Sequence, residues 1–196
     1  MIRKLQNKNV SINDKDSFFD YWRSKINSGD KSVCINHIYE DVKNQKINSF
    51  YQLVGECFES IGFKEVSVTR DGDTNNRMDA IIIDDSYSIP IEIKSPREVE
   101  YVNIKSIRQA LENKIVLLSR KFHNTTYECT SLAVAYDLPQ DRSEVNTIVG
   151  YIYKSFGINV GYLDIKTLLS IRWNVEVDNI QFDLNDIRTL KGALNV

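Results

Sequence analysis

Apolar residues in this chain form two kinds of pattern, short continuous runs and longer stretches with helical spacing. Strands are predicted where β-branched and apolar residues form short runs, at residues 64–69, 80–83, 89–93, 130–136 and 157–163. Helices are predicted where an apolar stripe or a capping residue is present, at residues 17–23, 33–43, 49–61, 102–122, 141–156, 164–171 and 183–194. Helices and strands in this order predict an α/β fold, a three-layer α/β/α sandwich with a central mixed sheet.

The length of 196 residues is that of one domain with a substantial core. We expect residues 49–196 to form this core, because all the predicted strands lie there. Residues 1–48 carry no recognisable chemistry and are expected to form an N-terminal helical extension packed on the core.

The most informative pattern is a predicted β-hairpin. The apolar runs 80–83 and 89–93 flank a polar connector, so they should pair as antiparallel strands. Side chains alternate between the two faces of a strand, so Glu92 and Lys94 lie on the same face. Asp79 opens the first strand, and a register that places it opposite Glu92 or Lys94 brings two carboxylates and an ammonium together. A shift of one residue would put Asp79 on the other face.

Such a cluster has a chemical interpretation. Two neighbouring carboxylates repel each other unless a cation lies between them. Mg²⁺ prefers oxygen ligands, keeps several waters and takes only one or two carboxylates. A lysine beside the metal can hold a water molecule or help to deprotonate it, while the metal stabilises charge on a phosphate under attack. This combination suits hydrolysis of a phosphodiester.

The acid-x-Lys spacing has little specificity by itself. It occurs in this chain at residues 41–43, 92–94, 112–114 and 164–166. Only residues 92–94 lie in a β-run that follows an Asp-led β-run. The alternative is an edge hairpin whose exposed face carries a cross-strand Glu/Lys pair with no catalytic role.

The order of Asp79, a hairpin and Glu92-Ile93-Lys94 resembles the PD-(D/E)xK nuclease superfamily. The resemblance implies that Asp79 and Glu92 bind the metal, with the Ile93 carbonyl as a third ligand, and that Lys94 positions the attacking water. Met78 stands where many members have the proline. Gly62 at the end of a helix and the strand before Leu168 also resemble FokI-type cleavage domains of Type IIS restriction enzymes.

The resemblance implies a Mg²⁺-dependent DNA endonuclease, with Mn²⁺ as a substitute, that leaves a 5′-phosphate and a 3′-hydroxyl. A single domain of this size is expected to hold one active site and to cut one strand of double-stranded DNA. Cleavage of both strands would need a second active site, from a copy of this chain or from a different subunit. The expected partner on DNA is therefore a larger DNA-recognition subunit or a second nuclease active site, in a hetero- or homodimer. Two alternatives remain, a repair, recombination or defence nuclease of the same fold, and a non-catalytic scaffold that holds a partner.

Further site residues are proposed by position. Glu56, on the helix before the strands, is a candidate for the additional acid that some family members place there, and a solvated helix charge is the equal alternative. The candidates for contact with DNA are Arg77, Arg97, Lys105, Arg108 and Gln109. Arg77 could instead pair with a nearby aspartate, and surface charges on a helix are ordinary.

Charge and cysteine content refine this picture. The formal net charge of −2 lacks the basic excess that usually drives unaided DNA binding, so we expect weak binding by the isolated chain. The three cysteines have no C-x-x-C spacing, which favours reduced, buried thiols in a cytoplasmic protein. His37 and His123 have no metal-ligand spacing, and no apolar run is long enough to cross a membrane.

Overall fold

The computed structural model describes residues 30–69, 78–84, 86–120 and 124–194. These residues form one six-stranded sheet in which the strands lie side by side in sequence order. The strands are β1 (Glu65–Val68), β2 (Ala80–Ile83), β3 (Ser88–Lys94), β4 (Ser131–Ala135), β5 (Val160–Asp164) and β6 (Gly192–Ala193). The first three pair antiparallel and the last three continue parallel to β3, so the sheet is mixed, as predicted.

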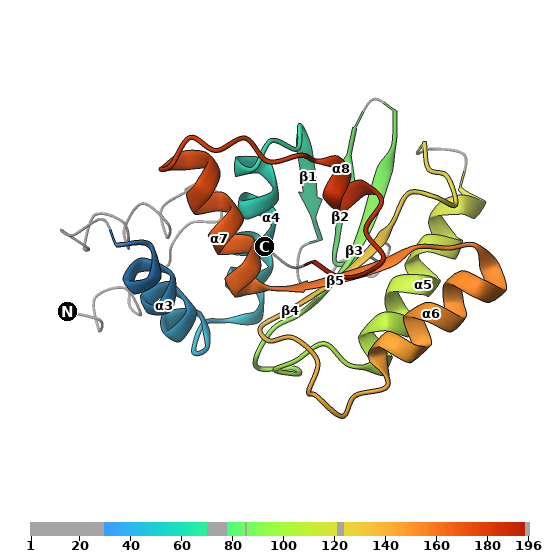
Figure 1. Cartoon of the computed structure of the whole chain (residues 1–196), viewed down its shortest axis with the longest axis horizontal. Coiled ribbons are helices and arrows are strands. Elements are labelled where there is room, and N and C mark those ends of the chain that lie inside the picture. The colour runs from blue at the N-terminus through green and yellow to red at the C-terminus, as the bar shows by residue number, and fades with distance from the viewer. Residues whose placement is uncertain (1–29, 70–77, 85, 121–123, 195–196) are drawn as a thin grey trace.

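Helices cover both faces of this sheet, and the predicted three-layer α/β/α sandwich is confirmed (Figure 1). The helices are α3 (Lys31–Val42), α4 (Ile47–Ser60), α5 (Ile104–Ser119), α6 (Val145–Phe156), α7 (Ile165–Glu176) and the short α8 (Asn185–Arg188). The isoleucines of β3 face α4 and α7, and the larger core lies there. The alanines and Tyr162 of the central strands face α5 and α6. Figure 1 shows α3 stacked outside α7 on the first of these faces.

Capping residues explain where several helices begin and end. The carboxylate of Asp164 accepts a hydrogen bond from the Thr167 N–H and so caps α7, as predicted. Gly62 follows α4 with φ of +117°, a left-handed conformation that favours glycine. The side chains of Asn103 and Ser106 form reciprocal bonds at the start of α5. Asn103 and Asp164 start α5 and α7 at the carboxyl edge of the parallel strands, whereas Gly62 ends α4 at the opposite edge, just before β1.

Two sequence predictions are wrong in detail. The predicted helix over residues 183–194 is only the single turn of α8, because the chain then extends to pair Gly192 and Ala193 with β5. The apolar spacing of residues 102–122 predicts an inward stripe of Ile104, Ile107, Leu111, Ile115 and Leu118, but Ile115 is 50% exposed. The buried residues of this helix are Ser106, Ile107, Ala110, Asn113, Lys114 and Leu117. The same spacing places Lys114 outside the inward stripe, but Lys114 is fully buried and donates to the Thr125 hydroxyl at 2.7 Å.

The cysteine prediction is confirmed, since Cys34, Cys57 and Cys129 are buried free thiols. None of the helices in the described ranges is both long and apolar enough to cross a membrane. The predicted helix at residues 17–23 and the candidate Arg77 lie outside the described residues.

Candidate active site

The β2–β3 hairpin brings the predicted acids and lysine together. Ala80 pairs with Ile91 in the antiparallel register, so the next residues outward, Asp79 and Glu92, lie beside each other. An Asp79 carboxylate oxygen accepts a hydrogen bond from the Ile93 N–H at 2.8 Å. The register that the sequence required is therefore present, and Asp79 faces the strand that carries Glu92 and Lys94.

Glu92 is held from two sides. Its Oε1 lies 2.7 Å from the Lys94 ammonium, since both side chains project from one face of β3. Its Oε2 accepts a hydrogen bond at 3.0 Å from the amide of Asn113 on α5. Glu92 is 3% exposed, so these two bonds fix an almost fully buried carboxylate in one orientation. Asn113 was not predicted as a site residue. The signal that could have found it is an amide on the Ile107–Ala110 side of α5, where only apolar residues would be expected.

A second supporting group lies after Lys94. The Glu98 carboxylate accepts hydrogen bonds from the Ser95 N–H at 3.0 Å and from the Ser95 hydroxyl at 2.9 Å. The spacing Ser95-x-x-Glu98 is that of a capping box, and the bond from the Ser95 N–H to the Glu98 side chain is one half of it. The Glu98 N–H bonds to the Ser95 carbonyl oxygen instead of the hydroxyl. The Glu98 charge reaches Asp79, whose pKa it helps to raise.

Tyr51 on α4 contacts both Glu98 and the backbone of Ile93, the residue between Glu92 and Lys94. Its hydroxyl lies 2.9 Å from the Ile93 carbonyl oxygen and 3.1 Å from the Glu98 carboxylate. A phenol donates only one proton, so the two acceptors share it. Burial and the neighbouring charges of Asp79, Glu98 and Glu92 raise the pKa of Tyr51, which keeps this proton in place. Tyr51 thereby ties the orientation of the Ile93 carbonyl to that of Glu98.

The electrostatics of the cluster favour a cation. Burial, followed by the charge of Glu92, raises the pKa of Asp79 to about 7, although the Ile93 N–H bond and Lys94 oppose the shift. Burial alone would lower the pKa of Lys94, but the bond to Glu92 and the surrounding carboxylates outweigh it and raise that pKa. Lys94 is therefore a protonated donor at neutral pH. It can hold a water molecule or a phosphate oxygen, but it has no lone pair with which to take a proton.

The donor set fits Mg²⁺ rather than a metal that needs many protein ligands. Within the described ranges, no three His, Cys, Asp or Glu side chains gather as a metal site. Mg²⁺ needs only one or two carboxylates beside its waters. Asp79 and Glu92 supply these, and the mutual repulsion that raises the pKa of Asp79 is what a divalent cation would relieve.

The predicted acid Glu56 is not among the charges that act on Asp79. The charge of Glu56 raises the pKa of Cys57, which the charge of Arg172 on α7 lowers. The charges that shift the pKa of Asp79 are those of Glu92, Lys94 and Glu98. The role of Glu56 as the additional acid stays a prediction. Glu98, whose charge acts on Asp79, is a second candidate for that role.

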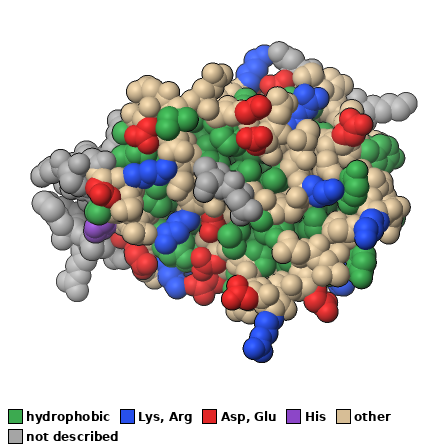
Figure 2. Space-filling view, viewed as in Figure 1, with side chains coloured by type: hydrophobic (Ala, Val, Ile, Leu, Met, Phe, Trp, Pro, Cys, Tyr) green, Lys and Arg blue, Asp and Glu red, His purple; other side chains and the backbone are tan. Residues whose placement is uncertain are grey.

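The described candidates for contact with DNA come from the turn after Lys94 and from α5. The Arg97 guanidinium is exposed and donates to the Asn44 carbonyl oxygen at 2.8 Å. Lys105 and Arg108 are exposed on α5. Gln109 lies one helical turn before Asn113, and its buried Oε1 has no hydrogen-bond partner in the described part of the chain. On the face shown in Figure 2, basic side chains are scattered among acidic ones, as the small net charge leads one to expect.

Comparison with known proteins relates this architecture to a nuclease. No protein-family model matches the sequence, and no curated protein matches it either. The structure is similar to that of restriction endonuclease FokI, with a TM-score of 0.53 and 11% sequence identity over 93% of this chain. It is also similar to FokI bound to DNA, with a TM-score of 0.51 and 13% identity over 93% of this chain. The match covers 34% of each FokI chain, so this chain corresponds to only a part of that enzyme. The expected FokI-like fold is confirmed.

The raised pKa of Asp79 predicts a pH-dependent stability. The carboxyl titrates near its ordinary value of 3.8 when the chain unfolds and at about 7 in the folded protein. The folded state binds the proton more tightly, so the stability that protonation of Asp79 contributes is fully present below pH 4 and is lost as the pH rises through 7. Asp79→Asn removes this pH dependence, because an amide does not ionise, and it keeps an oxygen acceptor for the Ile93 N–H. Without metal, urea unfolding should give similar stabilities at pH 4 and a more stable variant at pH 8. The expected gap is a few kcal/mol, at roughly 1.4 kcal/mol per pKa unit.

Added Mg²⁺ provides the control for this comparison. At pH 8 it should stabilise the wild type and leave Asp79→Asn almost unchanged, because only the wild type keeps both carboxylates. A variant that is less stable than the wild type at every pH would contradict the proposed repulsion between Asp79 and Glu92.

Proposed function

We propose that this chain is a Mg²⁺-dependent DNA endonuclease domain that hydrolyses phosphodiester bonds. The observation that carries the proposal is the convergence of Asp79, Glu92 and Lys94 at the end of one hairpin, within a fold similar to part of FokI. Asp79 and Glu92 would hold the divalent cation, and the Ile93 carbonyl is a candidate third ligand. Mn²⁺ should substitute for Mg²⁺, because it also prefers oxygen ligands.

The cation, when bound, would neutralise negative charge on the phosphate under attack. The residues of the chain then have distinct tasks. Lys94, as a protonated donor, orients the attacking water or a phosphate oxygen. Asn113 keeps Glu92 facing Asp79, and Tyr51 keeps the Ile93 carbonyl in position. One water is consumed, the bond between phosphorus and O3′ breaks, and the products carry a 5′-phosphate and a 3′-hydroxyl.

One site of this kind acts on one strand. We infer that cleavage of both strands requires a second active site, from another copy of this chain or from a different subunit. The chain corresponds to about a third of FokI, and its net charge of −2 gives little non-specific attraction to DNA. Both points support delivery by a DNA-recognition subunit or domain, as in a Type IIS restriction enzyme.

The cleavage assay that tests the mechanism uses supercoiled plasmid with Mg²⁺ or Mn²⁺. Asp79→Ala and Lys94→Ala should each lower the nicking rate at least about 100-fold, because each removes charge stabilisation at the reacting phosphate. Matched substitutions at exposed positions, Asp141→Ala and Lys154→Ala, should leave the rate within about twofold, a surface effect of the usual size.

Retention of wild-type nicking by both site variants would remove the mechanism. Absence of nicking by the wild type, together with absence of Mg²⁺ binding, would favour a nuclease-like scaffold. A wild type that nicks branched DNA in preference to duplex would favour a repair or recombination enzyme.

Tyr51 provides a second test, of positioning rather than of charge. Tyr51→Phe removes the hydroxyl that contacts the Ile93 carbonyl and Glu98, at a cost of about one hydrogen bond. We expect the nicking rate at saturating DNA to fall about tenfold, the Mg²⁺ concentration for half-maximal rate to rise, and the KM for DNA to stay the same.

Two glutamates serve as the matched pair for this experiment. Glu98→Gln should resemble Tyr51→Phe, since it weakens the acceptor that shares the Tyr51 proton. Glu56→Gln on the same helix as Tyr51 should leave the Mg²⁺ dependence unchanged. A normal Mg²⁺ dependence in Tyr51→Phe would show that the hydroxyl has only a structural role.

A further inference from the structure

A buried acceptor without a donor lies on α5, the helix that supports Glu92. The amide oxygen of Gln109 accepts no hydrogen bond from any group in the part of the chain that the structure describes. Buried polar atoms of native proteins nearly always have a partner, because a buried acceptor without one is destabilising. An unpaired acceptor next to a reaction site indicates a donor that arrives only with the reactants.

The packing of α5 on the hairpin shows which way Gln109 faces. Leu117, Asn113 and Gln109 are spaced four residues apart, so they lie along one side of the helix. Leu117 shares a hydrophobic cluster with Ile81 of β2, and Asn113 bonds to Glu92 of β3. This side of α5 therefore covers the two strands that carry the acids.

Gln109 lies level with the end of β3. The strands β3 and β4 are parallel, so α5, which connects them, runs in the opposite direction to both. Four residues of a helix cover about 6 Å, and two residues of a strand cover about 6.6 Å. The step from Asn113 back to Gln109 therefore corresponds to the step from Glu92 on to Lys94. Since Glu92 and Lys94 project from one face of β3, the Gln109 amide and the Lys94 ammonium border the same space.

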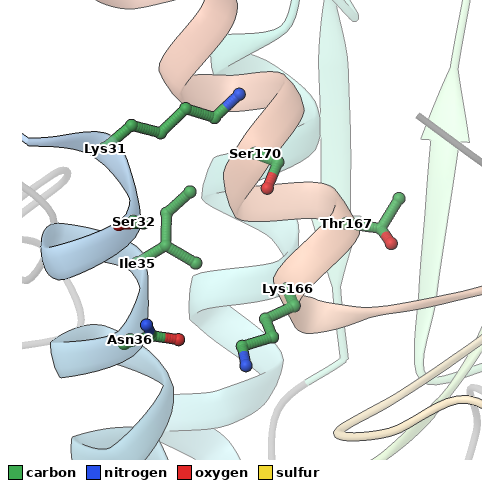
Figure 3. Close-up of a pocket in the computed structure, with 7 residues that line it drawn as sticks. All are labelled: Lys31, Ser32, Ile35, Asn36, Lys166, Thr167 and Ser170. Atoms are coloured by element: carbon green, nitrogen blue, oxygen red, sulfur yellow. The ribbon is translucent and has the colours of Figure 1, made fainter.

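This space is separate from the pocket between α3 and α7 (Figure 3). That pocket has a volume of about 340 Å³, and the side chains of Lys31 and Lys166 line it. Lys31 donates to the Asn174 side-chain oxygen, and the Lys166 ammonium lies over the Tyr39 ring. The helices α3 and α7 cover the face of the sheet opposite to the candidate active site, so the pocket has no part in the proposed reaction.

A water molecule beside Lys94 needs an acceptor as well as a donor. The Lys94 side chain is 12% exposed, so water has access to this end of the cluster. An ammonium has three N–H donors and no acceptor, so Lys94 can bond to Glu92 and still donate to a water oxygen. Each oxygen of Glu92 already has a donor, one from Lys94 and one from Asn113. The Gln109 oxygen is the acceptor that remains for a proton of this water.

We propose that Gln109 and Lys94 together hold the attacking water. Lys94 donates to the water oxygen, and the Gln109 amide oxygen accepts a hydrogen bond from one of the water protons, which leaves a lone pair to point at phosphorus. The amide orients the water and takes no proton from it. This inference rests on the proposed function, and it moves Gln109 from the predicted contacts with DNA to the reacting atoms.

Gln109→Leu removes the acceptor and keeps a side chain of similar size and high helix propensity. We expect kcat for plasmid nicking to fall about 10- to 100-fold, because a misplaced nucleophile reacts more slowly. The KM for DNA and the Mg²⁺ concentration for half-maximal rate should stay the same. Urea unfolding in EDTA should show no loss of stability, since the substitution removes a buried oxygen that has no donor.

Gln109→Glu separates an acceptor from a donor. The carboxylate keeps an acceptor oxygen at the same reach and lacks the N–H donors of the amide. We therefore expect Gln109→Glu to nick DNA faster than Gln109→Leu does. A contact from the Gln109 N–H to a DNA phosphate would make Gln109→Glu the slower of the two and would raise its KM. Glu112→Gln, at an exposed position of the same helix, is the matched control and should change neither kcat nor KM.

Three results would overturn the inference and leave the proposed function in place, provided that nicking by the wild type still depends on Asp79 and Lys94. They are a wild-type kcat in Gln109→Leu, a slower reaction in Gln109→Glu than in Gln109→Leu, and a loss of stability in EDTA that shows a structural role for the amide. A wild type that does not nick DNA would overturn the proposed function and this inference with it.

Discussion

The candidate site depends on the pairing of β2 with β3. Antiparallel pairing of Ala80 with Ile91 leaves Asp79 and Glu92 side by side, where burial makes their mutual repulsion strong. A fold gains no stability from two crowded carboxylates, so their presence in an otherwise apolar hairpin is typical of a functional site. Lys94 relieves part of the repulsion, and its bond to Glu92 keeps the cluster together in the absence of a divalent cation.

Side chains from three other segments hold this cluster in place. Asn113 comes from the helix that follows the hairpin, Tyr51 from the helix that precedes it, and Glu98 from the turn after Lys94. Asn113 and Tyr51 each contact a group of β3 rather than the solvent. The positions of Glu92 and the Ile93 carbonyl are therefore set by the packing of α4 and α5 on opposite faces of the sheet. This support explains how a hairpin with a polar connector can carry a fixed site.

The sequence is sufficient to predict features that depend on local information, such as the face of a strand on which a side chain lies. Alternation along the strands placed Glu92 and Lys94 on one face, and a single register decision added Asp79. It was insufficient where the information depends on packing. Helical spacing alone put Ile115 inward and Lys114 outward, because the apolar pattern of α5 is interrupted by the polar residues that face β3. In the sequence, Tyr51 is one more aromatic residue of a helix with an apolar stripe, and only the tertiary structure brings its hydroxyl to the Ile93 carbonyl oxygen.

The central claim is that Asp79 and Glu92 together bind a divalent cation. The most direct measurement is anomalous diffraction from crystals of the whole chain soaked in Mn²⁺. The account predicts a single strong anomalous peak at bonding distance from both carboxylates, and its disappearance in Asp79→Asn crystals. A map without a peak at this position, at a Mn²⁺ concentration that fills other sites, would contradict it.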